Sequence, residues 1–300
     1  MQLAGVADDG AAHDELRAAA RVPRRGVAGA HGELGAAILR PDGRVVVGLP
    51  SPPVHLVSRP VLHAALLDGL PAGTVEWSTP VRDLADLPEA DVVVGADGIH
   101  SVVRAAVTPV APRPLGTVAL RGTVPGAVAS VTETWGRGRI FGITPQAPDS
   151  TNWFACFRAD LLDRRPAGLS QAQFLGELYR DWHPAVRRVV GAVTDDGIDR
   201  RTLLDLPPLP TYVDGRHVLV GDAAHAMAPN LGRGACESLV DAVCLADALA
   251  AASSVEEGLR RYDSLRRRRT RPVVRLSRLL NRVSTTRLPG RRGPVLTGVP

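Results

Sequence analysis

The sequence predicts an α/β (α+β) fold in which an antiparallel sheet is inserted into a parallel-sheet domain and helices follow at the C-terminal end. Two short apolar runs of the kind found in buried parallel strands, Val92–Val94 and Val218–Val220, each precede a helical pattern. Between them, residues 115–158 hold alternating runs rich in β-branched residues, which favour antiparallel strands. Apolar residues at helical spacing recur after residue 255.

The first third of the chain is weakly patterned. Its predicted elements are, in order, a short helix at 14–20, a strand at 44–49, a helix at 60–70, a strand at 91–95 and a short helix at 100–107. The first strand follows a Pro-Asp-Gly turn. Pro60 suits the first turn of a helix in which Leu62, Leu66 and Leu70 share one face.

The middle of the chain predicts the inserted sheet. Its strands are expected at 117–123, 127–134, 139–144, 152–157 and 199–203, with helices at 171–179 and 184–192. Gly136-Arg137-Gly138 is typical of a tight hairpin turn.

The last part returns to the parallel sheet. A strand is expected at 217–220, and helices at 234–250, 255–269 and 272–283. In the last helix Val273, Leu276, Leu279, Leu280 and Val283 are predicted to form one apolar face. We therefore divide the chain into a discontinuous parallel-sheet domain (1–110 and 205–285), a sheet domain (111–204) and a flexible tail (286–300).

The composition is that of a globular protein and excludes several classes. The 300 residues are 45% hydrophobic and 22% charged, which argues against general disorder. The longest uncharged stretch, Val45–Ser58, contains three prolines and is shorter than the about 20 residues of a membrane span. Met1–Asp9 has no signal-peptide pattern. Three cysteines are too few for a disulfide framework, so we expect a cytoplasmic protein.

The net charge of +5 is unevenly distributed. Residues 256–300 hold 13 arginines and three acidic residues, so the rest of the chain carries −5. Binding of nucleic acid is therefore the weakest interpretation. The run Arg266–Arg269 is expected to be the solvated end of a helix rather than a contact for nucleic acid or anionic lipid.

The first segment that can carry chemistry is ADVVVGADGIHSVVR, Ala90–Arg104. After the predicted strand, Gly98 lets a ligand approach the backbone and Asp97 can accept hydrogen bonds from hydroxyl groups. Ser101 and Arg104 share a helical face. A plain strand-turn-helix with a capping Asp explains the same spacing equally well.

The second segment runs from His217 to Leu249. Its strand delivers Gly221 and Asp222 at the carboxyl end, where parallel sheets bind ligands. A glycine-containing loop then leads into a long helix, whose first N–H groups and dipole favour negative charge. Asp222 is placed to bond a chain of hydroxyl groups. His225 is expected to shape the loop rather than act as a base, and Cys236 and Cys244 to pack.

Together these segments resemble the second and third fingerprints of the FAD-dependent aromatic-ring monooxygenases of the para-hydroxybenzoate hydroxylase type (class A flavoprotein monooxygenases). The resemblance covers roughly Val45–Val283 in the right order. It implies that Asp97 and Gly98 contact both the flavin and the reduced nicotinamide nucleotide. It also implies that Gly221 and Asp222 bind the ribityl chain.

Two further sites follow from the same resemblance. The loop that lies against the isoalloxazine ring in the family matches Pro229, Gly232, Gly234 and Ala235, with Arg233 where the family usually has Gln. The segment SRPVLHAALLDGL resembles the family's helix whose leading arginine, here Arg59, reaches FAD.

The resemblance implies an FAD-dependent monooxygenase that uses NADPH or NADH and O2. Through a C4a-hydroperoxyflavin, it would hydroxylate an aromatic or polyketide-like small molecule under the inserted sheet. Candidates for lining that pocket are Trp135, Phe141, Trp153, Phe154 and Phe157, although core packing is expected for most of them. No catalytic acid or base is named, and no metal site is expected because the histidines lack ligand spacing. The oligomeric state is left open.

One element of the family pattern has no counterpart in this sequence. The family opens with a strand, G-x-G-x-x-G and a helix, whereas Gly136, Gly138 and Gly142 give only G-x-G-x-x-x-G inside a predicted hairpin. We therefore expect an FAD-binding domain without its first βαβ unit, owing to a misassigned start codon, a truncated gene or a unit supplied by another chain. A flavin-dependent reductase or halogenase of the same fold, or a truncated non-catalytic remnant, remains an alternative.

Overall fold

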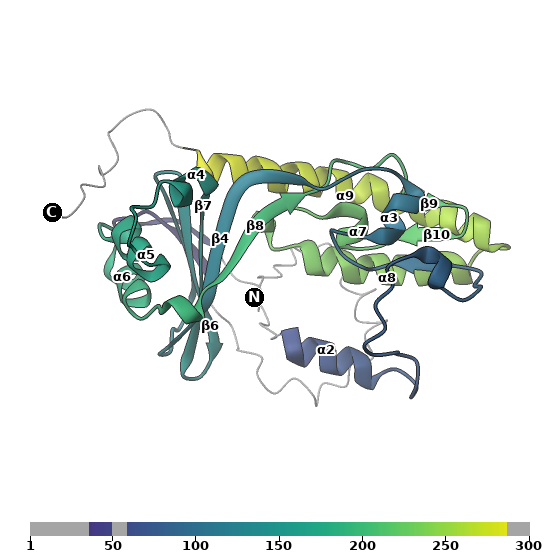
Figure 1. The fold of residues 1–300 in the computed structure, drawn as a ribbon, viewed down its shortest axis with the longest axis horizontal. Coiled ribbons are helices and arrows are strands. Elements are labelled where there is room, and N and C mark those ends of the chain that lie inside the picture. Colours follow the sequence, from purple (N-terminus) through teal and green to yellow (C-terminus); the bar gives the residue numbers. More distant parts are fainter. Residues whose placement is uncertain (1–35, 50–58, 287–300) are drawn as a thin grey trace.

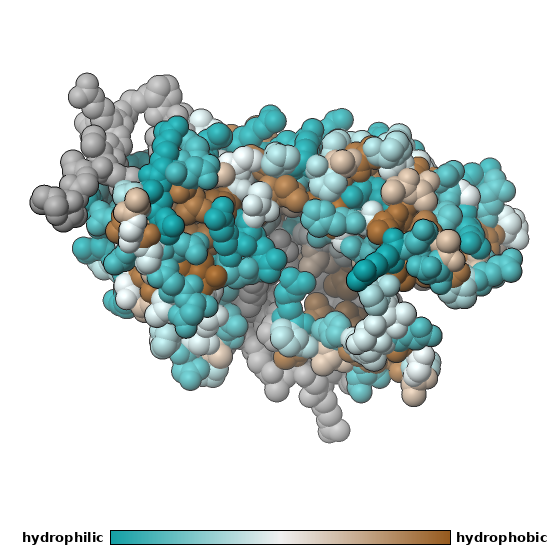
Figure 2. All heavy atoms as spheres, viewed as in Figure 1, coloured by the Kyte–Doolittle hydropathy of each residue, from teal (hydrophilic) through white to brown (hydrophobic). Residues whose placement is uncertain are grey.

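The computed structural model describes residues 36–49 and 59–286, which form two sheets flanked by helices (Figure 1). The predicted helix at 14–20 and residues 287–300 of the predicted tail lie outside this part of the chain. No helix within the described ranges is both long and apolar enough to cross a bilayer. The face seen in Figure 2 is largely hydrophilic, with smaller apolar patches between the polar residues.

The larger sheet has seven strands in the order β2-β1-β5-β6-β7-β4-β8. They are β1 (Ala36–Leu39), β2 (Val45–Leu49), β4 (Arg113–Pro125), β5 (Val131–Gly136), β6 (Arg139–Ala147), β7 (Ser150–Arg158) and β8 (Asp199–Asp205). All neighbours pair antiparallel except β1 and β5, which run parallel. The antiparallel sheet predicted for the middle of the chain is confirmed. It also takes in β1 and β2 from the N-terminal part, and the domain boundaries stay a prediction.

The predicted hairpin turn joins β5 to β6. Gly136 pairs with Arg139, so Arg137 and Gly138 alone make the turn. Both have positive φ, 53° and 76°, as the two central residues of a type I′ turn require.

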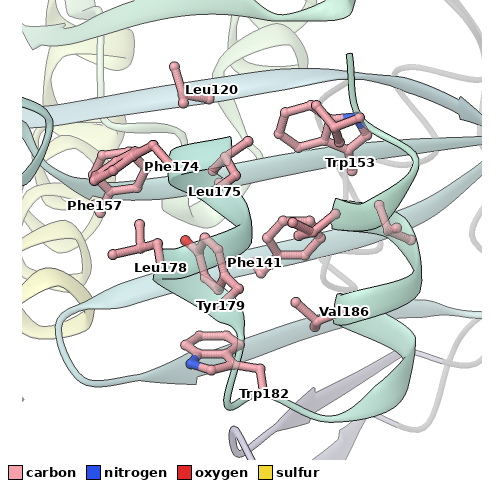
Figure 3. Close-up of a cluster of buried hydrophobic side chains, with 14 of the residues drawn as sticks. Leu120, Phe141, Trp153, Phe157, Phe174, Leu175, Leu178, Tyr179, Trp182 and Val186 are labelled. Carbon is pink, nitrogen blue, oxygen red and sulfur yellow. The ribbon is translucent and has the colours of Figure 1, made fainter. Parts of the chain in front are cut away.

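One face of the larger sheet is the main hydrophobic core (Figure 3). The helices α4 (Ala159–Asp163), α5 (Gln171–Tyr179) and α6 (Pro184–Gly191) follow β7. Ser170 and Gln173 start α5 with a capping box. Phe174 and Tyr179 of α5 meet the rings of Phe157 and Phe141, which are fully buried. Burial of each such ring contributes about 1.5–3 kcal/mol, so this face is committed to packing.

The smaller sheet has the order β3-β10-β9, with strands Val93–Gly95, His217–Leu219 and Val213–Asp214. β3 and β10 are parallel, whereas β9 is antiparallel to β10. Its helices are α3 (Val102–Val107), α7 (Asp222–His225), α8 (Gly234–Ala250) and α9 (Val255–Thr285), with the 3-10 turns η1 (Leu84–Asp86) and η3 (Pro229–Leu231). Val218, Leu219, Leu259 and Tyr262 belong to a second buried cluster. The predicted fold class, with parallel strands, an antiparallel sheet and C-terminal helices, is confirmed.

The prediction of two helices after residue 255 is wrong, because α9 runs unbroken from Val255 to Thr285 with Pro272 inside it. Proline removes one helical hydrogen bond, here the bond to the carbonyl of Arg268. Pro272 and Arg268 both lie on the exposed side, where water can hydrate that carbonyl. Residues on either side of the proline, Thr270 and Val274, are buried, so packing keeps the helix unbroken at this position.

The residues predicted to share one apolar face at the end of α9 do lie in one helix, but that face is largely exposed. Leu276, Leu279 and Val283 are 47%, 55% and 60% exposed. Beyond Val274 the buried positions are polar: Asn281 contacts the hydroxyl of Thr117 at 3.3 Å, and Ser277 contacts the sulfur of Met227 at 3.7 Å. The surface beneath α9 presents polar side chains, so the polar residues of the helix face it. The spacing of the apolar residues alone cannot show which side of the helix that surface covers.

The arginine run in α9 is not a solvated helix end. Arg266–Arg269 lies in the middle of the helix, and Arg266 is 2% exposed. Arg267 pairs with Asp263 at 3.0 Å, while Arg268 and Arg269 are exposed. The prediction fails for Arg266 because buried carboxylates from α8 surround its guanidinium.

Candidate functional site

The two chemistry-bearing segments meet at one edge of the smaller sheet. β3 and β10 run parallel, with Gly95 opposite Leu219. The N–H of Val220 donates to the carbonyl oxygen of Gly95 at 3.0 Å, which continues the pairing past the strand ends. The Asp97–Gly98 turn and the Gly221–Asp222 turn therefore leave the sheet side by side, at the carboxyl edge where parallel sheets bind ligands.

The Asp97–Gly98 turn leads directly into α3. One carboxylate oxygen of Asp97, Oδ2, accepts the N–H of Val102 at 2.7 Å, and Ser101 caps the helix by accepting the N–H of Arg104 at 2.9 Å. Asp97 itself is exposed. Gly98 has φ +80°, and an added Cβ would meet no atom within 4 Å. Oδ2 of Asp97 thus caps α3, as the capping interpretation predicts. The ligand-binding role of this turn stays a prediction.

The Gly221–Asp222 turn has a conformation that favours glycine. Gly221 has φ +59°, and a Cβ there would lie 2.6 Å from the Oγ of Ser238 on α8. Asp222 follows as the first residue of α7 and is exposed. Its carboxylate makes no hydrogen bond within the described part of the chain, so it is available to a ligand at the sheet edge.

The loop before α8 presents backbone donors near this turn. Pro229 opens η3, and Gly232 ends it in the left-handed conformation with φ +65°. α8 begins at Gly234, followed by exposed Ala235, and the residue before it, Arg233, provides no side-chain cap. Within the described residues, the first N–H groups of this 17-residue helix thus have no side-chain acceptor, an arrangement that attracts negative charge.

Arg104 ties the two turns together. This buried side chain donates to the carbonyl of Ile99, in the first segment, at 2.6 Å and to that of Ala223, in the second, at 3.1 Å. A third bond reaches the carbonyl of Val110 at 3.0 Å. Burial lowers the pKa of Arg104, while the charge of Asp97 raises it. The sequence placed Arg104 on the face of Ser101 but did not predict this bridge.

A group of buried charges behind the Gly221–Asp222 turn was missed from the sequence. Asp241 on α8 accepts the N–H of Gly221 at 2.7 Å, contacts Nε2 of His225 at 2.6 Å and pairs with Arg266 at 2.5 Å. Arg266 also pairs with Glu237 at 2.6 Å, and Glu237 pairs with Arg233 at 2.9 Å. We call Arg233, Glu237, Asp241, Arg266 and His225 the buried charge network. One signal was available: Glu237 and Asp241 share the helix face of buried Cys244 and Leu245.

The charges of the network shift the pKa values of its own members. Burial raises the pKa of Asp241, but the bonds from His225, Arg266 and the Gly221 N–H outweigh it and hold the pKa below its ordinary value. For Arg266, burial lowers the pKa, but Asp241 and Glu237 raise it above its ordinary value. Because Oδ2 of an ionised Asp241 already accepts the Gly221 N–H, the Nε2 of His225 must be the donor. His225, the last residue of α7, is thus tied to Asp241 of α8, and its role in shaping the loop stays a prediction.

Arg59 stands apart from this edge. It is the first residue of α2 (Arg59–Asp68), a helix with no buried residue that lies away from the two sheets in Figure 1. The structure thus groups eight of the nine predicted cofactor-binding residues around the smaller sheet and the start of α8, and leaves Arg59 outside this group. The role of each of the nine stays a prediction.

The five candidate aromatics divide between the two faces of the larger sheet. Phe141, Trp153 and Phe157 lie in the core beneath α5 and α6. Side chains alternate along β7, so Phe154 lies on the opposite face. There it pairs with Gly142 of β6, and Gly142 in turn pairs with Glu133 of β5. Trp135 donates its indole N–H to Glu133 at 2.8 Å, and burial raises the pKa of Glu133. The candidates for lining a pocket are thus reduced to Trp135 and Phe154.

Comparison with known proteins places this geometry in a family. A family described as FAD binding domain matches residues 81–277. The chain is 35% identical over 249 residues to 3-amino-4-hydroxybenzoate 2-monooxygenase of Streptomyces cremeus, covering 76% of this chain and 62% of the relative. It is 34% identical over 194 residues to aurachin C monooxygenase/isomerase of Stigmatella aurantiaca, covering 62% of this chain and 49% of the relative. The chain thus spans less than two thirds of the length of either relative.

Solved structures share the fold. A salicylate hydroxylase substrate complex superposes with a TM-score of 0.76 at 22% identity, covering 93% of this chain and 80% of that chain. Klebsiella pneumoniae HpxO complexed with FAD and uric acid gives 0.73 at 23% identity, covering 86% of this chain and 74% of that one. The family match spans more than half of the chain, and the resemblance inferred from residues 90–104 and 217–249 is confirmed: the chain belongs to the FAD-binding domain family.

Proposed function

We propose that this chain forms the flavin- and substrate-binding part of an FAD-dependent monooxygenase that hydroxylates an aromatic small molecule with NADPH or NADH and O2. The observation that carries the proposal is the meeting of the Asp97–Gly98 and Gly221–Asp222 turns at one sheet edge, bridged by Arg104. The match to the FAD-binding domain family over residues 81–277 supports the choice of cofactor. The names of both curated relatives describe monooxygenases, which supports the reaction class.

The residues fit the cofactor in three respects. Asp222 offers an exposed carboxylate for the hydroxyl groups of a ribityl chain. The uncapped start of α8 offers N–H donors for the negative charge of a reduced flavin ring. Gly98 and Gly232, both at positive φ, allow close backbone approach. Bound FAD would supply the oxygen-activating redox chemistry, and the protein would bind and orient it and exclude water.

For the substrate we propose the face of the larger sheet that carries Trp135, Phe154 and Glu133. Two aromatic rings suit an aromatic ligand, and the half-buried Glu133 carboxyl could accept a hydrogen bond from a hydroxyl or amino group on it. We also propose that the enzyme acts in the cytoplasm, which suits its three free cysteines.

FAD titration followed by flavin fluorescence tests the proposal. We expect binding by the wild-type chain and about tenfold or greater weakening in Asp222→Ala, the equivalent of losing one charge-assisted hydrogen bond. Asp214→Ala is the matched control, because Asp214 is an exposed aspartate on β9 that pairs with His217, at the opposite end of β10. Equal affinity of Asp222→Ala and wild type would refute the ribityl contact. An unaltered affinity in Arg59→Ala would remove Arg59 from the site.

A further inference from the structure

The buried charge network connects four separate parts of the candidate site. Asp241 holds the N–H of Gly221, and with it the turn that carries Asp222. Arg233 lies in the loop before α8, Glu237 and Asp241 on α8, and Arg266 on α9. Arg233 pairs with Glu237, Glu237 with Arg266, and Arg266 with Asp241. Displacing one of these parts would therefore displace its neighbours.

Apart from Arg233, which is 34% exposed, the network is buried, and its charges balance. The side chains of Asp241, Arg266 and Glu237 are 0%, 2% and 5% exposed, and His225 is 1% exposed. Two arginines face two carboxylates, so the charges of these four side chains cancel. Buried pairs of this kind gain little over apolar packing but are costly to break, because one charge is then left without a partner. Such a network fixes one arrangement of the groups it joins.

The arrangement it fixes is the relation between the Gly221–Asp222 turn and the first turn of α8. An oxygen of Asp241 bonds the turn directly, and Asp241 lies two helical turns beyond Gly234 on the same helix. Arg266 holds Asp241 and Glu237 from α9 through Nε and a terminal nitrogen. The exposed Asp222 carboxylate and the uncapped N–H groups of α8 are thereby held at a set spacing.

We propose that Asp241 and Arg266 are positioning residues of the cofactor site. They hold the Asp222 turn and the start of α8 in register, so that one ligand can engage both. The inference rests on the proposed function, since FAD is the ligand that the two parts would share. A network that served only to stabilise the fold would lower the stability of the protein without a specific effect on the cofactor.

Asp241→Asn tests the proposal, because it keeps the shape of the side chain and removes its charge. Tyr212→Phe is the matched control: it removes the hydroxyl that bonds Thr270 of the same helix α9 at 2.6 Å, and it keeps the ring that lies beside His225. Two quantities are measured for each variant, the FAD dissociation constant and the amide hydrogen exchange of the peptide 219–225.

We expect Asp241→Asn to weaken FAD binding at least about tenfold (~1.4 kcal/mol) and to speed exchange at Gly221. Tyr212→Phe should stay within about threefold of wild type, at a comparable loss of unfolding stability. Equal weakening by both variants would overturn the proposal. Should Asp241→Asn fail to fold, Arg266→Lys keeps the charge but cannot span both carboxylates, and FAD affinity equal to that of wild type would overturn the proposal.

The two readouts separate this proposal from the proposed function. If the wild-type chain binds no FAD, the proposed function fails, and the exchange measurement still decides the role of the network. Faster exchange at 219–225 in Asp241→Asn, with none in Tyr212→Phe, supports positioning of the turn. Equal exchange in both variants overturns it.

Discussion

Replacing Arg104 by Met tests whether this side chain bridges the two turns of the site. Met keeps an unbranched apolar stem but is shorter than Arg and donates no hydrogen bond. Arg104 makes three bonds, of 3.0, 3.1 and 2.6 Å, to carbonyl groups of Val110, Ala223 and Ile99. A bond from a charged donor contributes about 1.5–3 kcal/mol. Because bonds that share one side chain are not additive, we expect a loss of about 4 kcal/mol in unfolding free energy.

Urea unfolding followed by circular dichroism measures the loss, and thermal unfolding should show a Tm lower by about 10 °C. Arg216→Met is the control, since Arg216 is exposed and makes one bond, of 3.1 Å, to the carbonyl of Ala90. It should change stability by less than about 0.5 kcal/mol. If Arg104→Met costs no more than Arg216→Met, the two turns are not held together by Arg104 and the reasoning is refuted.

Three further predictions follow from the described geometry. The pKa of Asp241 is lowered in the folded protein, so its ionised form stabilises the fold above about pH 4, and this stability is lost as pH falls. The difference in unfolding free energy between wild type and Asp241→Asn, measured by urea unfolding at several pH values, should therefore narrow below about pH 4. A difference that does not change with pH contradicts this prediction. Burial raises the pKa of Cys156 to about 12, so a thiol reagent at pH 8 should modify half-buried Cys236 first and Cys156 only after unfolding, and Cys236→Ser should abolish the fast phase. Pro272→Ala should raise the unfolding free energy by roughly 1–3 kcal/mol, because it restores a helical bond in α9; a loss of stability would mean that the proline is needed there.

Most helices and strands could be predicted from short stretches of the sequence, because residues within those stretches determine them. The range of α5 follows from its capping residues Ser170 and Gln173, and the hairpin between β5 and β6 from the glycine that its turn requires. The two turns of the site were predicted because an apolar strand that ends in a glycine and an aspartate is a short-range pattern. Their meeting at one edge was not predicted from the sequence, and the parallel pairing of β3 with β10 shows it.

The errors arose where a distant surface decides the outcome. α9 turns Ser277 and Asn281 inward and Leu279 outward, because the strands and loop beneath it supply polar partners. Arg266 is buried for the same reason, through carboxylates contributed by another helix. Periodicity within one segment identifies a helix, but the side that faces inward depends on the surface it meets.

Hydrogen exchange of the wild-type chain with and without FAD tests the central claim most directly. If the two turns form one cofactor site, FAD should slow exchange in the peptides covering 96–103 and 221–235 together, to the same extent at each FAD concentration. Protection of one peptide without the other, or of neither at FAD concentrations that saturate the fluorescence change, would contradict the account.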